Sequence, residues 1–345
     1  MYTVQPKKLL IINILDILRR YSDEEHRLSQ KDIENILEKE YSMTADRKAI
    51  KRNLMNLIDF GYNISFTEIE RNGKSGDETI CTDWYLERDF SDAELRLLID
   101  SLLFSKHIPY HQCKKLIEKL KGLSNEYFSA KVRHVSNLPE NHIANPQLFY
   151  TIDVLDDAIE SHKQVQFALN EVNHLKHRII KTNEDGDIKL YTFNPYQMVA
   201  TNGHYYLIGN FDYYDNIAYI RIDHISNIEI LDSRVKPMKQ VTGLENGLKL
   251  PEHMAEHIYM LYGKTETVKF RCPKSLADQL VDWFGTDFKV LSVEEDVMTV
   301  QVRVNTRAMR FWALQYGSFV EVLEPKELRD DIIHAVKNMN EVYGV

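Results

Sequence analysis

Arg221 is the side chain whose setting in the sequence points most directly to chemistry. Residues 204–209 and 219–225 alternate in the manner of paired strands, and residues 212–216 between them favour turns. The pattern predicts a β-hairpin with Arg221 in the middle of its second strand. Because burial of an unpaired charge costs several kcal/mol or more, Arg221 is expected either to pair with Asp223 on the same face or to bind an anion.

The neighbouring side chains indicate what kind of anion would fit. Arg221 and His224 offer charge, while tyrosines of the first strand offer rings and hydroxyl groups. Tyr205 and Tyr206 must lie on opposite faces of that strand, and we expect Tyr206 to face the cavity. These residue types favour an anionic effector such as a nucleotide or a short oligonucleotide. The expected effector-binding residues are His204, Tyr206, Arg221, Asp223 and His224.

Three segments, in this order along the chain, resemble the signature of the WYL domain. Residues 194–199 resemble its proline-containing strand, residues 205–207 its Trp-Tyr-Leu tripeptide, and residues 220–225 its Phe-Arg-Leu-Asp-Arg-Ile strand. Tyr205 stands in place of the tryptophan and His224 in place of the second arginine. The resemblance implies a small Sm-like or SH3-like β-barrel that binds effectors in bacterial transcription regulators.

Composition sets limits on the rest of the chain. A length of 345 residues, with 43% hydrophobic and 28% charged residues, is typical of a globular protein of two or three domains. No run of 18 apolar residues and no secretory signal is present, so we expect a cytoplasmic protein without a membrane partner. Three widely spaced cysteines argue against a disulfide framework or a structural zinc.

Residues 44–58 concentrate positive charge in a chain whose net charge is −9. Thr44 is the expected N-cap, and apolar residues at helical spacing mark the buried face. Four cations share the other face and, with Asp46, leave a local net charge of +3. Local positive charge is what phosphate contacts need, so the helix is a candidate DNA-binding element, although such a face is often only solvated surface. The four cations are Arg47, Lys48, Lys51 and Arg52.

The surroundings of this helix favour DNA binding. Two amphipathic helices, residues 7–20 and 30–38, precede it, and a hairpin with a polar tip at residues 71–77 follows it. This order resembles a winged helix-turn-helix, the domain most often fused to WYL domains, in which the third helix enters the major groove and the wing contacts the backbone or minor groove. Ser29 is the expected cap of the second helix and Gly61 the expected end of the third, and Ser91 is expected to open a capping box at the start of the connector that follows the hairpin. The expected DNA-binding residues are Thr44, Arg47, Lys48, Lys51, Arg52, Arg71 and Lys74.

The C-terminal third follows a β-α-β-β-α-β order with a final helix, which is ferredoxin-like, and residues 317–329 resemble the WYL C-terminal extension domain. The predicted fold class is therefore α+β and multidomain. The expected domains are a winged helix-turn-helix at 1–88, a helical connector at 89–140, the WYL barrel at 141–234, a linker at 235–263 and the extension domain at 264–345.

A lone winged helix reads few base pairs, which favours a homodimer on an inverted repeat. The connector around Leu95, Leu98 and Leu102 is one candidate interface. The C-terminal domain around Phe311, Trp312 and Tyr316 is the other.

Enzyme functions find little support in the sequence. Residues 253–257 have the His-x-x-Glu-His form of an inverted zinc protease motif, but they follow Pro251 in a connector and lack a marked third ligand, so we expect His253 and His257 to be surface histidines. No cofactor motif appears. We expect a ligand-responsive transcription regulator that binds duplex DNA and is not an enzyme. The alternative is an RNA- or single-strand-binding accessory protein that modulates another nucleic-acid enzyme, because Sm-like barrels bind strands directly.

Overall fold

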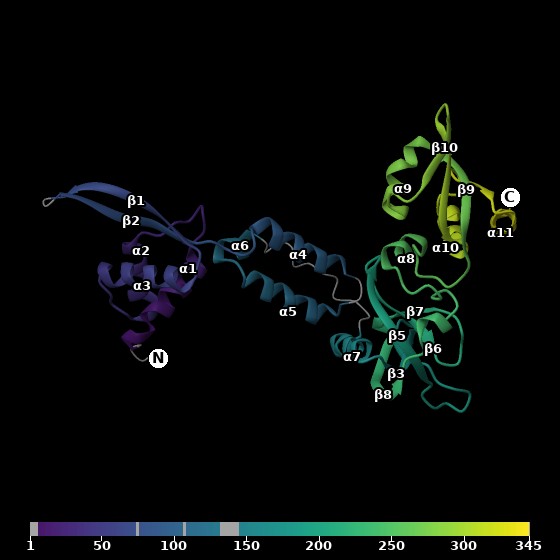
Figure 1. The fold of residues 1–345 in the computed structure, drawn as a ribbon, viewed down its shortest axis with the longest axis horizontal. Helices are drawn as coiled ribbons and strands as arrows, with labels where there is room; N and C mark the ends of the chain where they lie inside the picture. The colour runs from purple at the N-terminus through teal and green to yellow at the C-terminus, as the bar shows by residue number, and fades with distance from the viewer. Residues whose placement is uncertain (1–5, 74–75, 106–107, 132–144, 345) are drawn as a thin grey trace. The chain divides into compact units, whose positions relative to one another are not determined.

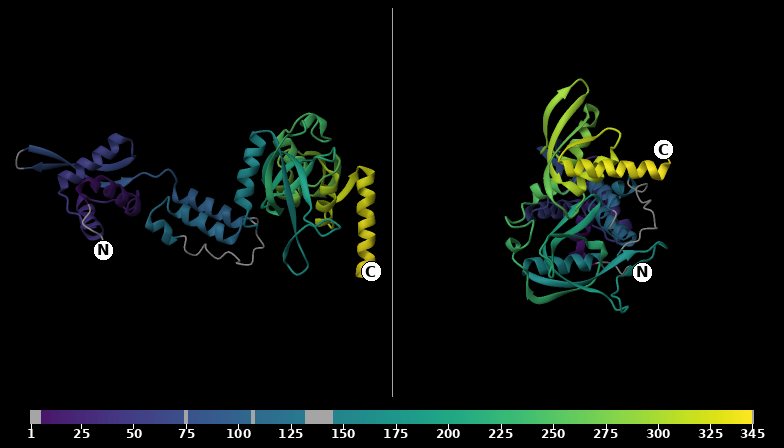
Figure 2. Two further views of the ribbon diagram at one scale, coloured as in Figure 1. Left: turned by 90° about the horizontal axis from the view of Figure 1, so that it is seen from below. Right: turned by 90° about the vertical axis from the view of Figure 1, so that its right-hand side faces the viewer.

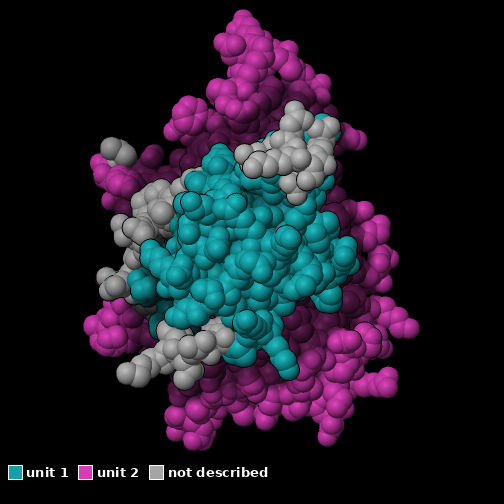
Figure 3. All heavy atoms as spheres, turned by 90° about the vertical axis from the view of Figure 1, so that its left-hand side faces the viewer, with its two compact units in different colours: residues 1–142 teal, residues 143–345 magenta. Residues whose placement is uncertain are grey.

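The computed structural model describes residues 6–73, 76–105, 108–131 and 145–344. The chain divides into two compact units, residues 1–142 and 143–345 (Figure 3), and each is described by itself. Within the described ranges, helices occur in both units, with one two-stranded sheet in unit 1 and two larger sheets in unit 2, so the prediction of a mixed, multidomain fold is confirmed. The expected domain border at 140/141 lies outside the described residues. Among the described residues, no helix is both long and apolar enough to span a bilayer.

Three helices and a hairpin begin unit 1 (Figure 1). Buried aliphatic side chains from all three helices form one core with Trp84 of the hairpin. Ser29 closes a capping box at the start of α2, and Gly61 ends α3 at a φ of 111°, a backbone conformation that glycine adopts readily. The cap at Ser29 and the stop at Gly61 were predicted. The elements are α1 (Leu10–Tyr21), α2 (Gln30–Tyr41), α3 (Arg47–Phe60), β1 (Ile64–Gly73) and β2 (Gly76–Leu86).

A helical connector completes unit 1. Its helices α4 (Asp92–Phe104) and α5 (Tyr110–Lys121) pack side by side around Leu95 and Ile117, and α6 (Glu126–Lys131) follows. The capping box at Ser91 starts α4 as predicted. Leu95 is fully buried in this small core, so it cannot contribute to a dimer interface, whereas Leu97 and Phe104 are 68% and 79% exposed.

Unit 2 begins with a helix packed on a sheet whose strand order is β4-β3-β5-β6-β7, with β8 paired to β3. Gly209 of β6 pairs with Pro195 of β5, and a Cβ atom at Gly209 would stand 2.1 Å from the Phe193 ring. The elements are α7 (Leu148–Glu160), β3 (Lys163–Val172), β4 (Arg178–Ile180), β5 (Leu190–Thr201), β6 (His204–Phe211), β7 (Ala218–Arg221) and β8 (Ile225–Arg234).

One prediction about this sheet was wrong. Residues 219–225 are not a single strand, because β7 ends at Arg221 and a 3-10 turn over Ile222–His224 follows. The turn carries the chain away from β6, so that β8 pairs with β3 instead. Arg221 therefore lies at the end of its strand.

The segment at 235–263, expected to be a linker, supplies side chains to two cores. Leu244 and Met260 are buried against the sheet of β3–β8, and Ile258 is buried in the C-terminal core. Its helix α8 (Leu250–Glu256) contacts β11 and α9 of the C-terminal domain. The prediction of surface histidines was wrong for His257, which is 7% exposed.

The C-terminal domain combines a sheet with helices (Figure 2). Its four strands lie in the order β10-β11-β9-β12, and α9, α10 and α11 supply buried residues to its core. Trp312 is fully buried in this core, so it is not available for a dimer interface, whereas Phe311 is 47% exposed. The elements are β9 (Thr265–Pro273), α9 (Ala277–Phe284), β10 (Lys289–Glu294), β11 (Val297–Asn305), α10 (Thr306–Gln315), β12 (Glu321–Glu324) and α11 (Lys326–Tyr343).

Candidate nucleic-acid interface and effector site

Helix α3 starts two residues later than the sequence suggested. The side chain of Asp46 accepts a hydrogen bond from the backbone N–H of Ala49 at 2.7 Å and is the N-cap, so the assignment of Thr44 as the cap was wrong. Met43 is buried just before the helix, and its N–H donates to the Leu37 carbonyl. This packing fixes the chain so that the capping role passes to Asp46.

The two faces of α3 differ sharply. Ile50 and Leu54 are fully buried, and Leu57 is 4% exposed. On the opposite side Arg47, Lys48 and Arg52 are exposed, while Lys51 is half-buried. In the part of the chain that the structure describes, none of these four cations forms an ion pair. Their charge is therefore free to meet an external anion.

The hairpin β1–β2 supplies the wing-like element. Its strands pair antiparallel up to Gly73 and Gly76, so they extend further into the expected polar tip than predicted. Only the backbone of Arg71 is described, paired with Glu78, and Lys74 lies outside the described residues.

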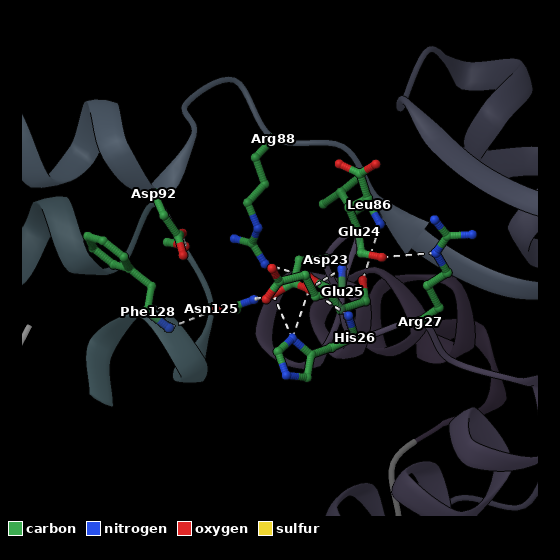
Figure 4. A network of polar contacts seen from close by, with 12 residues as sticks. Asp23, Glu24, Glu25, His26, Arg27, Leu86, Arg88, Asp92, Asn125 and Phe128 are labelled. Atoms are coloured by element: carbon green, nitrogen blue, oxygen red, sulfur yellow. Dashed lines mark hydrogen bonds and ion pairs between the residues drawn. The ribbon is translucent and has the colours of Figure 1, made fainter. Parts of the chain in front are cut away.

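A polar network ties the three-helix module to the connector (Figure 4). The Asp23 carboxylate accepts hydrogen bonds from the backbone and ring of His26 and from the side chain of Asn125. Arg88 donates to the carbonyl groups of Arg19 and Ser22 at 2.9 and 2.7 Å. These contacts lie within unit 1 and hold the base of the hairpin to both helical parts.

The candidate effector site is built around an ion pair. Arg221 donates from Nε and Nη2 to the two carboxylate oxygens of Asp223 at 3.0 and 2.7 Å. Asp223 is 3% exposed, whereas the Arg221 side chain is 32% exposed. Burial opposes ionisation of Asp223, but the hydrogen bonds and the charge of Arg221 outweigh it and lower the pKa of the carboxyl group. The pairing of Arg221 with Asp223, one of the two expected arrangements, is present.

Sequence reasoning missed a second cation at this site. Arg178 of β4 donates from Nη1 to the backbone carbonyl of Asp223. Burial lowers the pKa of Arg178, the Asp223 carboxylate opposes this shift, and the Arg221 charge adds to it. The guanidinium groups of Arg221 and Arg178 thus both contact Asp223, the first at its carboxylate and the second at its backbone carbonyl. No local pattern marked Arg178, because β4 reaches the site only through its pairing with β3.

The remaining expected residues surround the pair. Tyr206 of β6 lies opposite Arg221 in the strand register, and the His204 ring meets the Tyr206 ring edge-on at a centroid distance of 6.3 Å. Burial raises the pKa of Tyr206, so its hydroxyl remains a donor at neutral pH. Burial lowers the pKa of His224 despite the Asp223 carboxylate. The structure therefore brings His204, Tyr206, Arg221, Asp223 and His224 together with Arg178.

Comparison with known proteins bears on the family. Residues 264–339 match the model of the WCX domain. A curated relative, the uncharacterized HTH-type transcriptional regulator YobV of Bacillus subtilis (strain 168), is 19% identical over 163 residues. In these two comparisons the chain is similar to WYL-domain helix-turn-helix regulators. The match covers 47% of this chain and 50% of YobV, so the chain spans about half the length of the curated relative it matches.

Two solved structures are similar at low identity. Proteasome accessory factor B/C of Arthrobacter aurescens is 14% identical, with a TM-score of 0.29, over 94% of this chain and 47% of that one. A CRISPR Cas-related protein is 11% identical, with a TM-score of 0.36, over 100% of this chain and 88% of that one. At these TM-scores neither structure contributes to the assignment. The match to the WCX model and the similarity to YobV confirm the family resemblance inferred from the sequence.

Proposed function

We propose that the protein is a transcription regulator that binds duplex DNA through residues 6–88 and senses an anionic effector in its WYL-like barrel. The observation that carries the proposal is the exposed, unpaired cationic face of α3 in a chain whose net charge is −9. Because phosphate contacts dominate DNA affinity, such a face on the third helix of a three-helix module suits the major groove. The naming of a relative as an HTH-type regulator supports it.

The order of elements supports the finer fold assignments. We infer that α1–α3 with β1–β2 form a winged helix-turn-helix, that β3–β8 form an Sm-like barrel, and that the strand order β10-β11-β9-β12 is that of a ferredoxin-like domain. The WCX match to residues 264–339 supports the last of these.

The effector we propose is a nucleotide or short oligonucleotide. The Arg221 guanidinium is 32% exposed and can donate charge-assisted hydrogen bonds to a phosphate. Tyr206 beside Arg221 offers a ring and a hydroxyl donor. Effector binding would favour one arrangement of the chain over another and so change DNA affinity.

We further propose a two-fold dimer on an inverted repeat, because one winged helix reads too few base pairs to select a site. Leu97, Leu98 and Phe104 of α4 offer exposed apolar surface for it. Light scattering at micromolar concentration tests this proposal, since a monomeric mass that persists on a cognate duplex contradicts it.

Selection of binding sites from sheared genomic DNA tests the function. The full chain is expected to enrich duplex fragments that share an inverted motif, and the same selection with Arg47→Ala, Lys51→Ala and Arg52→Ala combined is expected to enrich none. Enrichment of single-stranded RNA or DNA over duplex would favour the accessory-protein alternative and contradict the proposal.

A further inference from the structure

A cluster of two histidines and a tyrosine, in which His257 is buried and the other two are half-buried, joins the barrel to helix α8. The Tyr219 hydroxyl on β7 lies 2.9 Å from Nε2 of His253 and 3.3 Å from Nδ1 of His257. The two imidazole rings stack with centroids 4.3 Å apart and planes 24° apart. His257 is 7% exposed. Among the described residues, no group of three or more His, Cys, Asp or Glu side chains is arranged to hold a metal ion.

Hydrogen bonding assigns the protons when both rings are neutral. Nδ1 of His257 faces two oxygen atoms, the Tyr219 hydroxyl and the Leu261 carbonyl at 3.4 Å, so it carries the hydrogen. Nε2 of His253 faces only the hydroxyl of Tyr219 among these groups, so it accepts the tyrosine proton. The Tyr219 hydroxyl, Nε2 of His253 and Nδ1 of His257 then each have a complementary partner.

A proton added to His253 breaks this arrangement. Two N–H donors would then point at one hydroxyl oxygen, and the tyrosine proton would lose its acceptor. The new positive charge would also lie against the stacked ring of His257, in a half-buried position where it is only partly hydrated. Protonation therefore opposes the docking of α8 on β7.

The charged groups around the cluster do not remove this effect. Glu256 of α8 favours a protonated His257, but it is paired with Arg303 of β11 at 2.8 Å. Glu245 and Glu252 line a shallow pocket of about 200 Å³ beside His253, together with Lys249, and both carboxylates are solvent-exposed. Burial, the largest influence, together with His257, lowers the pKa of His253 to about 4, and burial lowers that of His257.

The cluster lies at the segment that connects two hydrophobic cores. Leu250 and Met254 of α8 pack against the barrel core, while Ile258 just beyond the helix belongs to the C-terminal core. The Asn202 side chain of the barrel donates to the Ile258 carbonyl at 2.7 Å. Tyr219 and Arg221 lie two residues apart on one face of β7. The same short strand thus carries the candidate effector arginine and the anchor of α8.

We propose that Tyr219, His253 and His257 form a proton-sensitive joint between the barrel and the WCX domain, closed while both imidazoles are neutral and opened when His253 takes up a proton. This proposal goes beyond the proposed function and does not depend on DNA binding. With a pKa of about 6.5 in the open state and about 4 in the closed state, the opening constant rises roughly 30-fold from about pH 7.5 to about pH 5.

Hydrogen exchange of the full chain measures this opening directly. After correction for intrinsic exchange rates, the protection factor of amides in residues 250–261 is expected to fall roughly 30-fold over that pH range. Amides of α10 (Thr306–Gln315) in the same unit serve as the internal reference and are expected to change little. Equal changes in both segments would overturn the proposal.

Two further measurements make the test specific. His253→Gln keeps an acceptor for Tyr219 but cannot take up a proton near neutral pH, so the protection factors of residues 250–261 are expected not to change with pH. The control His334→Gln replaces an exposed histidine of α11 and is expected to behave as the parent chain. An NMR titration of the histidine rings in the parent chain is expected to place His253 well below pH 6. A His253 that titrates near pH 6.5, or a pH response retained in His253→Gln, refutes the joint.

Discussion

Replacement of Asp223 by asparagine tests the ion pair at the heart of the candidate effector site. The Asp223 side chain is 5% exposed, and its carboxylate accepts two hydrogen bonds from Arg221 at 3.0 and 2.7 Å. Hydrogen bonds to charged groups contribute about 1.5–3 kcal/mol to stability, and the loss of one partner from a buried pair costs about 3–5 kcal/mol. Because Arg221 is 32% exposed and can be hydrated, we expect a loss of about 2 kcal/mol.

Urea unfolding of Asp223→Asn, followed by far-UV circular dichroism, measures that loss. Asp232→Asn is the matched control, because Asp232 pairs with Lys163 at 3.2 Å but is fully exposed. Exposed pairs contribute about 0–1 kcal/mol, so the control is expected to unfold close to the parent chain. If the two variants are equally stable, the buried Arg221–Asp223 pair does not stabilise the folded chain more than an exposed pair does.

The pH dependence of the same variant has a definite sign. The pKa of Asp223 is lower in the folded chain than its ordinary value of about 3.9. The stability that ionised Asp223 contributes is therefore fully present above about pH 4 and is lost as the pH falls through the folded-state pKa. The stability difference between parent and Asp223→Asn is expected to shrink in that acid range. A difference that stays constant down to acid unfolding contradicts the assignment of the shift to Asp223.

Three further outcomes are expected. Asp46→Ala should lower the free energy of unfolding by about 1 kcal/mol, whereas Thr44→Ala should change it by less than about 0.5 kcal/mol, because Asp46 is the cap of α3; equal effects in thermal melts refute this. Gly209→Ala should strongly destabilise the sheet of β3–β8, because the new Cβ would stand 2.1 Å from Phe193. An unchanged melting temperature counts against this close approach of β6 to Phe193. Arg221→Ala should weaken binding of a trinucleotide probe by tenfold or more in calorimetry, and undiminished binding sets aside the effector site.

Local signals explain which parts of the fold could be predicted. The capping boxes at Ser29 and Ser91 and the stop at Gly61 depend on a few neighbouring residues, and the structure confirms all three. The choice between Thr44 and Asp46 as the cap was not local in this sense. Both residues can cap a helix, and the burial of Met43 against the core decides between them.

The errors in the barrel have a common physical origin. The pairing of β8 with β3 ends the predicted strand at Arg221, and the pairing of β4 with β3 brings in Arg178. His257 is buried because Tyr219 of a distant strand faces it. Each of these features depends on contacts between segments far apart in the sequence, which alternation of residue types does not encode. The DNA-binding and effector-binding roles of the side chains stay predictions.

The most direct test of the account is the affinity of the full chain for its selected duplex as a function of salt. The α3 variant with Arg47→Ala, Lys51→Ala and Arg52→Ala is compared with an α5 variant, Lys114→Ala, Lys115→Ala and Lys119→Ala, which removes the same charge from another exposed helix. We expect the α3 variant to bind the duplex at least tenfold more weakly, and the slope of its log affinity against log salt concentration to correspond to about three fewer phosphate contacts. The affinity of the α5 variant is expected to change little. Equal losses in the two variants, or no loss in the α3 variant, would contradict DNA binding through α3.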